Sequence, residues 1–145
     1  MNTRVVVATV AGGAALFLLG FLVFGLLLQP WIEGQMVKHD NLILSQPNFV
    51  TLIIANLVWA FLVALIFDRW ASINTFLGGL IGGAMISFLM DLYFQLMHMS
   101  FMNFFNGITP YLVDVLGFTL IGAIAGGVVA AVLGMMNKTV VTSQA

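Results

Sequence analysis

Charged residues are scarce in this sequence, and cysteine is missing altogether. Four basic and five acidic side chains make up 6% of the 145 residues, whereas 62% are hydrophobic and the mean hydropathy is +1.15. A soluble domain carries about 25% charged residues, because its whole surface must be hydrated. So few charges cannot cover a surface of this size, and we therefore expect most of it to face a lipid bilayer.

The same shortages argue against several classes of function. Without cysteine the chain has no disulfide and no thiolate ligand for zinc or an iron–sulfur cluster. The net charge of −1 comes without a cluster of Lys and Arg, which argues against nucleic acid as a partner, since phosphate neutralisation requires clustered basic residues. No Pro- or Ser-rich linker divides the chain, so we predict one transmembrane domain over residues 1–145.

Four apolar segments are long enough to cross a membrane as helices, which takes about 20 residues each. Gln29-Pro30-Trp31 is predicted to end the first, and Thr109 to cap the last, with Pro110 in its first helical position. The first run is too long for a cleaved signal peptide, so we expect it to be retained. We predict an all-α membrane protein, a bundle of four transmembrane helices with glycine-rich interfaces, spanning at residues 5–28, 49–67, 76–97 and 110–136.

An even number of spans puts both termini on the same side of the membrane. Arg4, Arg69 and Lys138 then share that side, and Lys38 lies on the other. The positive-inside rule therefore predicts cytoplasmic N and C termini. The loops at 29–48 and 98–109 are expected to face outward.

Glycine is abundant inside the predicted spans, with 15 residues in the chain. Because glycine in a helix costs about 1 kcal/mol relative to alanine, we expect these residues to serve close helix packing. An internal duplication would also explain the similar patterns around Gly12-Gly13 and Gly126-Gly127, but convergence on small interface residues is favoured. The third span carries two overlapping GxxxG pairs and the fourth a ridge at four-residue spacing; the packing glycines are Gly78, Gly79, Gly82, Gly83, Gly122, Gly126 and Gly134. These ridges are predicted to pack on each other or on another chain.

A few polar residues fall within the spans, and three helices place them at similar depth. A series at four-residue spacing runs from Gly79 and Gly83 through Ser87 and Asp91 to Gln95, and its neighbouring members share a helix face, with His98 three residues beyond. The ridge of the fourth span leads to Asp114, and Asn56 lies at a comparable depth in the second span. An acid within a span is a functional candidate by default. We therefore hypothesise an intramembrane cluster of Asp91, Asp114, Asn56, Gln95 and His98, in which Asp91 is protonated or shares a proton or cation with Asp114.

The competing interpretation of Asp91 is structural. A hydrogen bond to Asn56 or to a backbone carbonyl would set the register of the helices without any further role. Both interpretations are open at the level of sequence.

No metal or cofactor is predicted. Met97, His98 and Met99, with Met102 nearby, are weak candidates for copper, because thioether and imidazole are acceptable Cu(I) ligands. His39-Asp40 could contribute to such a site. Methionines in an apolar chain mostly fill gaps in packing, however. No arrangement of a nucleophile with a base is visible, so we do not expect an enzyme.

Three short stretches carry a resemblance to a known group of proteins. They are Gly20-Phe21-Leu22-Val23-Phe24-Gly25 leading into Pro30-Trp31, then Asn56-Leu57-Val58-Trp59, and the cluster at Gly78–Gly83. With these stretches the chain resembles small four-span bacterial inner-membrane proteins that are grouped in domain-of-unknown-function families. The resemblance implies a bacterial inner membrane and four spans, and it implies no activity or site residues.

Two main functional hypotheses follow from the sequence, and a membrane enzyme is kept as a third only because the outer loops could hold unrecognised groups. The first is a structural or accessory subunit or a homo-oligomer, packing through its glycine ridges on its own copies or on other membrane subunits. The second is a small transporter or ion or proton conductor that uses the polar cluster around Asp91.

Overall fold

The structure, a computed structural model, describes residues 2–38 and 46–142, with side chains as far as Asn137. Its helical segments are α1 (Thr3–Gly20), η1 (Phe21–Leu28), α2 (Gln29–Gln35), α3 (Phe49–Leu65), η2 (Ile66–Ala71), α4 (Phe76–Phe101) and α5 (Thr109–Thr142). Within the described residues, four continuous stretches are long and apolar enough to cross a membrane: Thr3–Gln35, Phe49–Ala71, Phe76–Phe101 and Thr109–Asn137. The predicted all-α bundle is confirmed.

The first span is longer than predicted. The prediction that Gln29-Pro30-Trp31 ends it was wrong, because helical structure continues through α2 to Gln35. Pro30 lies in the first turn of α2, where a helix does not use the missing amide hydrogen. The wider π-helical segment η1 precedes it and allows this new first turn to begin without interrupting the span.

The other boundaries also differ by a few residues. The second span continues through η2 to Ala71 and stops at Ser72, which has the left-handed φ of 51°. The third extends to Phe101 rather than 97. Thr109 is helical and not a cap, since the Ile108 carbonyl already accepts the Leu112 amide. α3 and α4 begin at the predicted residues. The side chains of Asn48 and Thr75 cap them by accepting hydrogen bonds from backbone amides.

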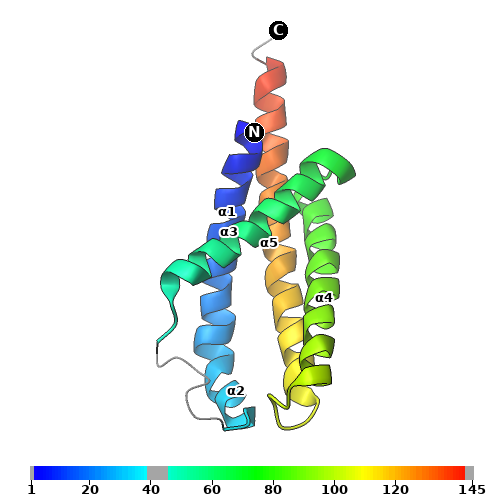
Figure 1. Cartoon of the computed structure of the whole chain (residues 1–145). Helices are drawn as coiled ribbons and strands as arrows, with labels where there is room; N and C mark the ends of the chain where they lie inside the picture. The colour runs from blue at the N-terminus through cyan, green and yellow to red at the C-terminus, as the bar shows by residue number, and fades with distance from the viewer. Residues whose placement is uncertain (1, 39–45, 143–145) are drawn as a thin grey trace.

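The helices form an elongated bundle (Figure 1). α1, α4 and α5 run along its length, and α3 crosses them obliquely. Both termini lie at one end, which we call the termini end; α2 and the connection between α4 and α5 lie at the other, the loop end. Half of the most apolar stretch of α5 is buried, against 17% for each of the other three spans. α5 is therefore the central helix.

The apolar core lies between α1, α3 and α5, not around α4. It includes Val5, Ala8 and Leu16 of α1, Trp59, Ala60, Val63 and Ala64 of α3, and Ile121, Ala125, Val129, Ala130 and Leu133 of α5. The buried residues of α4 are instead Gly79, Gly83, Ser87 and Gln95. α4 is therefore held to α5 by close backbone approach and by polar groups, which is how helices associate in lipid.

The glycine ridges of α4 and α5 pack on each other. A Cβ on Gly79 or Gly83 would meet the backbone of Gly126 or Gly122, so these helices approach too closely for any side chain. Gly78 and Gly82, the other GxxxG pair of α4, lie against Ile73 instead. Gly134 lies against the Asn74 carbonyl. The ridge faces are thus occupied within one chain.

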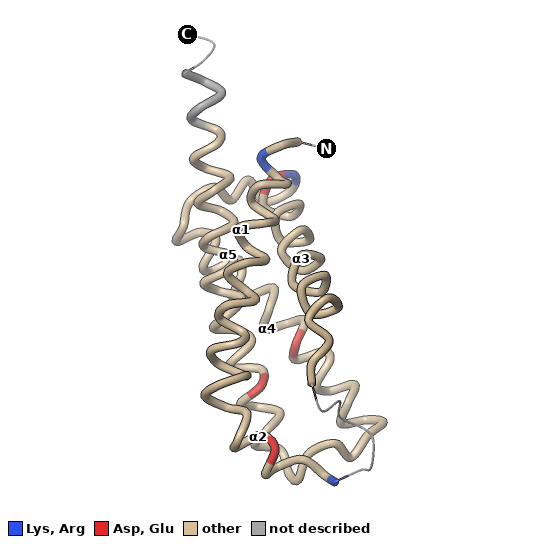
Figure 2. Tube along the Cα trace, turned by 90° about the vertical axis from the view of Figure 1, so that its left-hand side faces the viewer, with Lys and Arg blue, Asp and Glu red and all other residues tan. Residues whose placement is uncertain are grey.

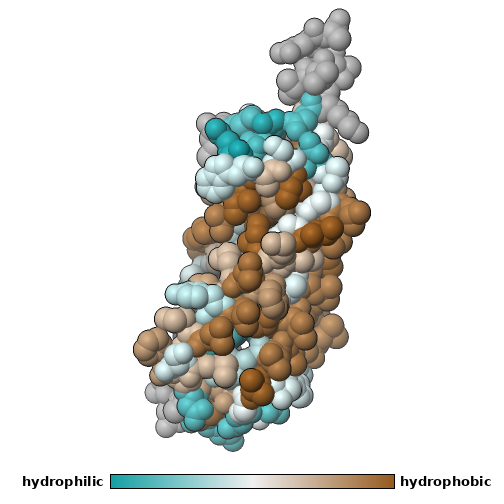
Figure 3. Space-filling model, turned by 90° about the vertical axis from the view of Figure 1, so that its right-hand side faces the viewer, coloured by the Kyte–Doolittle hydropathy of each residue, from teal (hydrophilic) through white to brown (hydrophobic). Residues whose placement is uncertain are grey.

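The surface matches a membrane-embedded bundle. Apolar side chains cover the middle of the face in Figure 3, and hydrophilic ones gather at both ends. The basic positions drawn in Figure 2 also lie near the two ends, whereas acidic positions occur along the length. Many large apolar side chains are more than half exposed, among them Leu18, Val58, Leu89 and Leu116. Lipid is the solvent in which such exposure costs nothing.

Candidate functional site

The polar residues of α4 begin where its glycines end. Ser87 and Gln95 are buried on the face that Gly79 and Gly83 start, and Asp91 lies one turn from each. α5 reaches the same level with Asp114, about three turns before the closely packed Gly126. The close approach of the two glycine faces therefore brings the polar ends of both helices together near the loop end.

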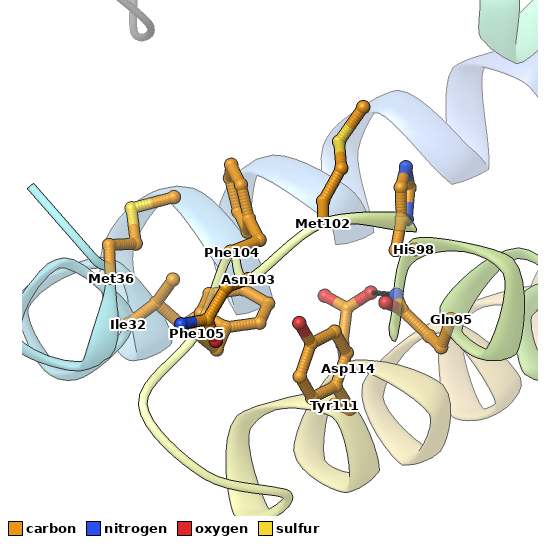
Figure 4. A pocket seen from close by; sticks show the side chains of 10 residues that line it. All are labelled: Ile32, Met36, Gln95, His98, Met102, Asn103, Phe104, Phe105, Tyr111 and Asp114. Carbon is orange, nitrogen blue, oxygen red and sulfur yellow. Dashed lines mark hydrogen bonds between the residues drawn. The ribbon is translucent and has the colours of Figure 1, made fainter. Parts of the chain in front are cut away.

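Gln95 joins the two aspartates. Its Nε2 donates a hydrogen bond to Asp114 Oδ2 and a longer one, 3.4 Å, to Asp91 Oδ1. Figure 4 shows the amide of α4 meeting the carboxylate of α5. The structure thus unites three members of the predicted cluster and makes the amide the link between the two acids. Asp91 Oδ2 is buried and has no hydrogen-bond partner among the described residues.

A pocket of about 610 Å³ opens beside this cluster. Gln95 and Asp114 form its polar end, and the rest of its lining is Ile32, Met36, His98, Met102, Asn103, Phe104, Phe105 and Tyr111. His98, Met102 and Asn103 are exposed, so the pocket reaches the surface next to the end of α4. Its volume falls in the range of small-molecule sites, about 300–1,000 Å³.

The backbone of two distant segments closes the pocket at the loop end. The Val37 amide donates to the Phe104 carbonyl at 2.9 Å, and the Asn106 amide donates to the Gln35 carbonyl at 2.8 Å. These bonds make an isolated antiparallel bridge between Met36 and Phe105. They tie the end of α2 to the α4–α5 connection, which positions Phe104 and Phe105 as an aromatic wall of the pocket. No sequence pattern had indicated this pairing.

The other two predicted members lie differently. His98 lines the rim of the pocket, but its imidazole points away from the Asp114 carboxylate (Figure 4). Asn56 is not part of this pocket. It lines a separate groove of about 550 Å³ between α1, η1, α3 and α5, and its amide donates to the Leu52 carbonyl of its own helix. Similar depth therefore did not bring Asn56 to Asp91.

The weak copper candidates do not assemble among the described residues. Met97 and Met99 are 40% and 43% exposed and lie outside the pocket lining, which Met102 and His98 share. His39 and Asp40 lie outside the described residues. Within the part of the chain that the structure describes, no group of three His, Cys, Asp or Glu residues could hold a metal ion.

A second polar cluster, at the termini end, was missed by the sequence reasoning. Arg4 Nε lies 2.9 Å from Asp68 Oδ1, and its guanidinium donates to Asn137 Oδ1. Arg69 lies 4.0 Å from the other Asp68 oxygen. These residues connect α1, η2 and α5. The sequence could have indicated this cluster, because four spans put Arg4 and Asp68 at the same membrane face.

Comparison with known proteins adds no assignment to this site: no protein-family model, curated protein or solved structure matches the chain.

Proposed function

We propose that this protein is a small membrane transporter or conductor for a proton or small cation, with Asp91, Gln95 and Asp114 as its binding site. The observation that carries the proposal is the single Gln95 amide that donates to a carboxylate on each side of it. Two carboxylates at one amide repel each other strongly where lipid and protein replace water. No Lys or Arg lines the pocket among the described residues. A proton or a cation is then the natural counter-charge.

Further polar atoms extend from this cluster toward the middle of the bundle and support conduction. Ser87 Oγ lies one turn from Asp91 and is buried, and neither it nor Trp59 Nε1 has a hydrogen-bond partner in the part of the chain that the structure describes. Both side chains lie against Gly122, since a Cβ there would meet the Ser87 hydroxyl and come 3.2 Å from Trp59 Cζ2. Buried polar groups are rarely left unpaired. A polar species that passes through the bundle would supply the missing hydrogen-bond partners.

The packing hypothesis receives less support from the glycines. Gly79, Gly83, Gly122 and Gly126 already face one another inside the chain. An accessory subunit or homo-oligomer would have to associate through other surfaces. The transporter function therefore accounts for more of what is unusual in this bundle.

The proposed location is a bacterial inner membrane with both termini in the cytoplasm. Arg4 and Arg69 lie together at the termini end, which supports a cytoplasmic position for that end under the positive-inside rule. The pocket would then lie in the outer half of the membrane. An N-terminal and a C-terminal tag found on opposite sides of the membrane would refute this orientation.

The transport proposal can be tested in proteoliposomes. Protons, sodium, potassium and methylammonium are offered separately under an imposed membrane potential, and flux is followed with dyes or radiolabel. Asp114→Asn and Asp91→Asn keep the shape of the side chain and remove its charge. We expect each to lower the flux of the transported ion by roughly tenfold or more, because the neutral amide lacks the negative charge that attracts a cation by about 4 kcal/mol at close range.

Glu33→Gln is the matched control. Glu33 is an exposed acid at the same end of the bundle that accepts a hydrogen bond from Gln29. Its substitution should leave flux unchanged. The proposal fails if the parent protein moves none of the four ions, or if the two aspartate variants conduct as well as the Glu33→Gln variant.

A further inference from the structure

The wall of the loop-end pocket is aromatic. Phe105 packs edge-on against Tyr111, with ring centroids 5.0 Å apart, and against Phe104, at 4.8 Å. Phe105 and Tyr111 are buried, and the backbone bridge between Met36 and Phe105 holds this wall in place. Ile32, Met36 and Met102 add apolar surface. The faces of aromatic rings attract cations as well as apolar groups.

The opposite end of the pocket offers one free carboxylate oxygen. Asp114 Oδ2 accepts the Gln95 amide, whereas Oδ1 has no hydrogen bond to any described residue. Figure 4 shows the carboxylate among the pocket side chains, next to the Tyr111 ring. An ionised carboxylate oxygen accepts more than one hydrogen bond. Oδ1 can therefore receive an N–H donor from a guest in the pocket.

The size and lining of the pocket select among cations. About 610 Å³ is far more space than a proton or a bare metal ion occupies. A bare ion such as Ca²⁺ would also need about six to eight oxygen ligands, and the lining supplies mostly carbon. An ammonium group on an apolar body fits both ends of the pocket, because its charge can lie on Asp114 while its apolar body packs on the aromatic wall.

We infer that the loop-end pocket binds an organic ammonium ion with an aromatic or branched apolar body. This inference rests on the proposed function, because it names the class of cation for the same site. The ammonium N–H donates to Asp114 Oδ1 while Gln95 holds Oδ2. The rings of Phe105 and Tyr111 pack against the apolar body.

Binding can be measured by calorimetry on the full chain in detergent micelles, with empty micelles as the blank. The probe is phenethylamine at neutral pH, where its amine is protonated, and 2-phenylethanol is the uncharged control of nearly equal shape. We expect the parent to bind the amine at least about tenfold more tightly than the alcohol, because the charged hydrogen bond is absent from the alcohol.

Two variants separate the parts of the site. Asp114→Asn keeps an acceptor for Gln95 and should remove the preference for the amine over the alcohol. Phe105→Leu should weaken both probes together, and Glu33→Gln should change neither. Equal affinity of the parent for the two probes, no saturable binding of the amine, or a preference that survives in Asp114→Asn would each overturn the inference.

The two proposals fail in distinguishable ways. Flux of protons or metal ions that requires Asp91 and Asp114, together with no binding of phenethylamine, overturns the organic ammonium site and leaves the transport proposal standing. Binding of phenethylamine that requires Asp114, with no flux of phenethylammonium or of the four other ions in the same proteoliposomes, overturns the transport proposal and leaves the binding site supported.

Discussion

Gly126→Leu should leave little folded protein. A Cβ at this position would lie 2.5 Å from the Gly79 carbonyl oxygen and 2.7 Å from Gly83 Cα. Both are backbone atoms of α4, which cannot rotate away as a side chain can. Overpacking a core usually costs about 1–3 kcal/mol, and a clash with backbone belongs at or above the top of that range. The free energy of unfolding, measured by denaturant titration in mild detergent, should fall accordingly.

Gly20→Leu is the matched control for this substitution. Gly20 also lies in a membrane-spanning helix, but nothing comes within 4 Å of a Cβ built there. The added side chain meets open space, and leaving glycine favours the helix by up to about 1 kcal/mol. The variant should therefore unfold at the same denaturant concentration as the parent, or at a slightly higher one. Equal loss of stability in both variants would contradict the described contact between α4 and α5.

The same pair of variants tests where the ridges act. A Gly126→Leu chain that folds normally and only loses oligomer mass would show that the ridge joins separate chains. Unfolding of the single chain is the expected outcome instead.

Arg4→Met should be the most destabilising change at the termini end. The Asp68 side chain is only 5% exposed, and Arg4 is its close cationic partner at 2.9 Å. Removing one partner of a buried pair costs about 3–5 kcal/mol, because it leaves an uncompensated charge. Arg4 is itself 31% exposed and Arg69 remains 4.0 Å away, so we expect about 2–3 kcal/mol here. Thermal unfolding in mild detergent measures this loss of stability.

Two further variants show whether the buried charge is the cause. Arg69→Met removes a side chain that is 65% exposed and should cost less than about 1 kcal/mol. Adding Asp68→Asn to Arg4→Met should restore much of the stability, since the unpaired charge is gone. An Arg4→Met variant no less stable than Arg69→Met would argue against a structural ion pair.

Part of the candidate site could be predicted because helical spacing is regular. In the series Gly79, Gly83, Ser87, Asp91 and Gln95, each residue lies about one turn from the next on any α-helix, so neighbouring members share a face. The partner of that face could not be read from spacing. Asn56 illustrates the limit, because its depth resembles that of Asp91 while the rotation of α3 turns it into another groove.

The pocket depended on contacts between residues far apart in the chain. Its aromatic wall is held in place because the Val37 amide donates to the Phe104 carbonyl, although almost half of the sequence separates the two residues. Hydrogen bonds between irregular segments leave no periodic pattern. The continuation of the first span past Pro30 could not be predicted either, because the π-helical segment before it has no distinctive composition.

The amino-acid sequence by itself determined that four apolar helices form, because a backbone surrounded by lipid must satisfy its own hydrogen bonds. It also determined which residues share a helix face. Only the tertiary structure decided that the glycines of α4 meet those of α5, that Gln95 joins Asp91 to Asp114, and that Asn56 stays apart. The physical reason is that the rotation and tilt of each helix depend on the packing of all its neighbours, which no local pattern specifies.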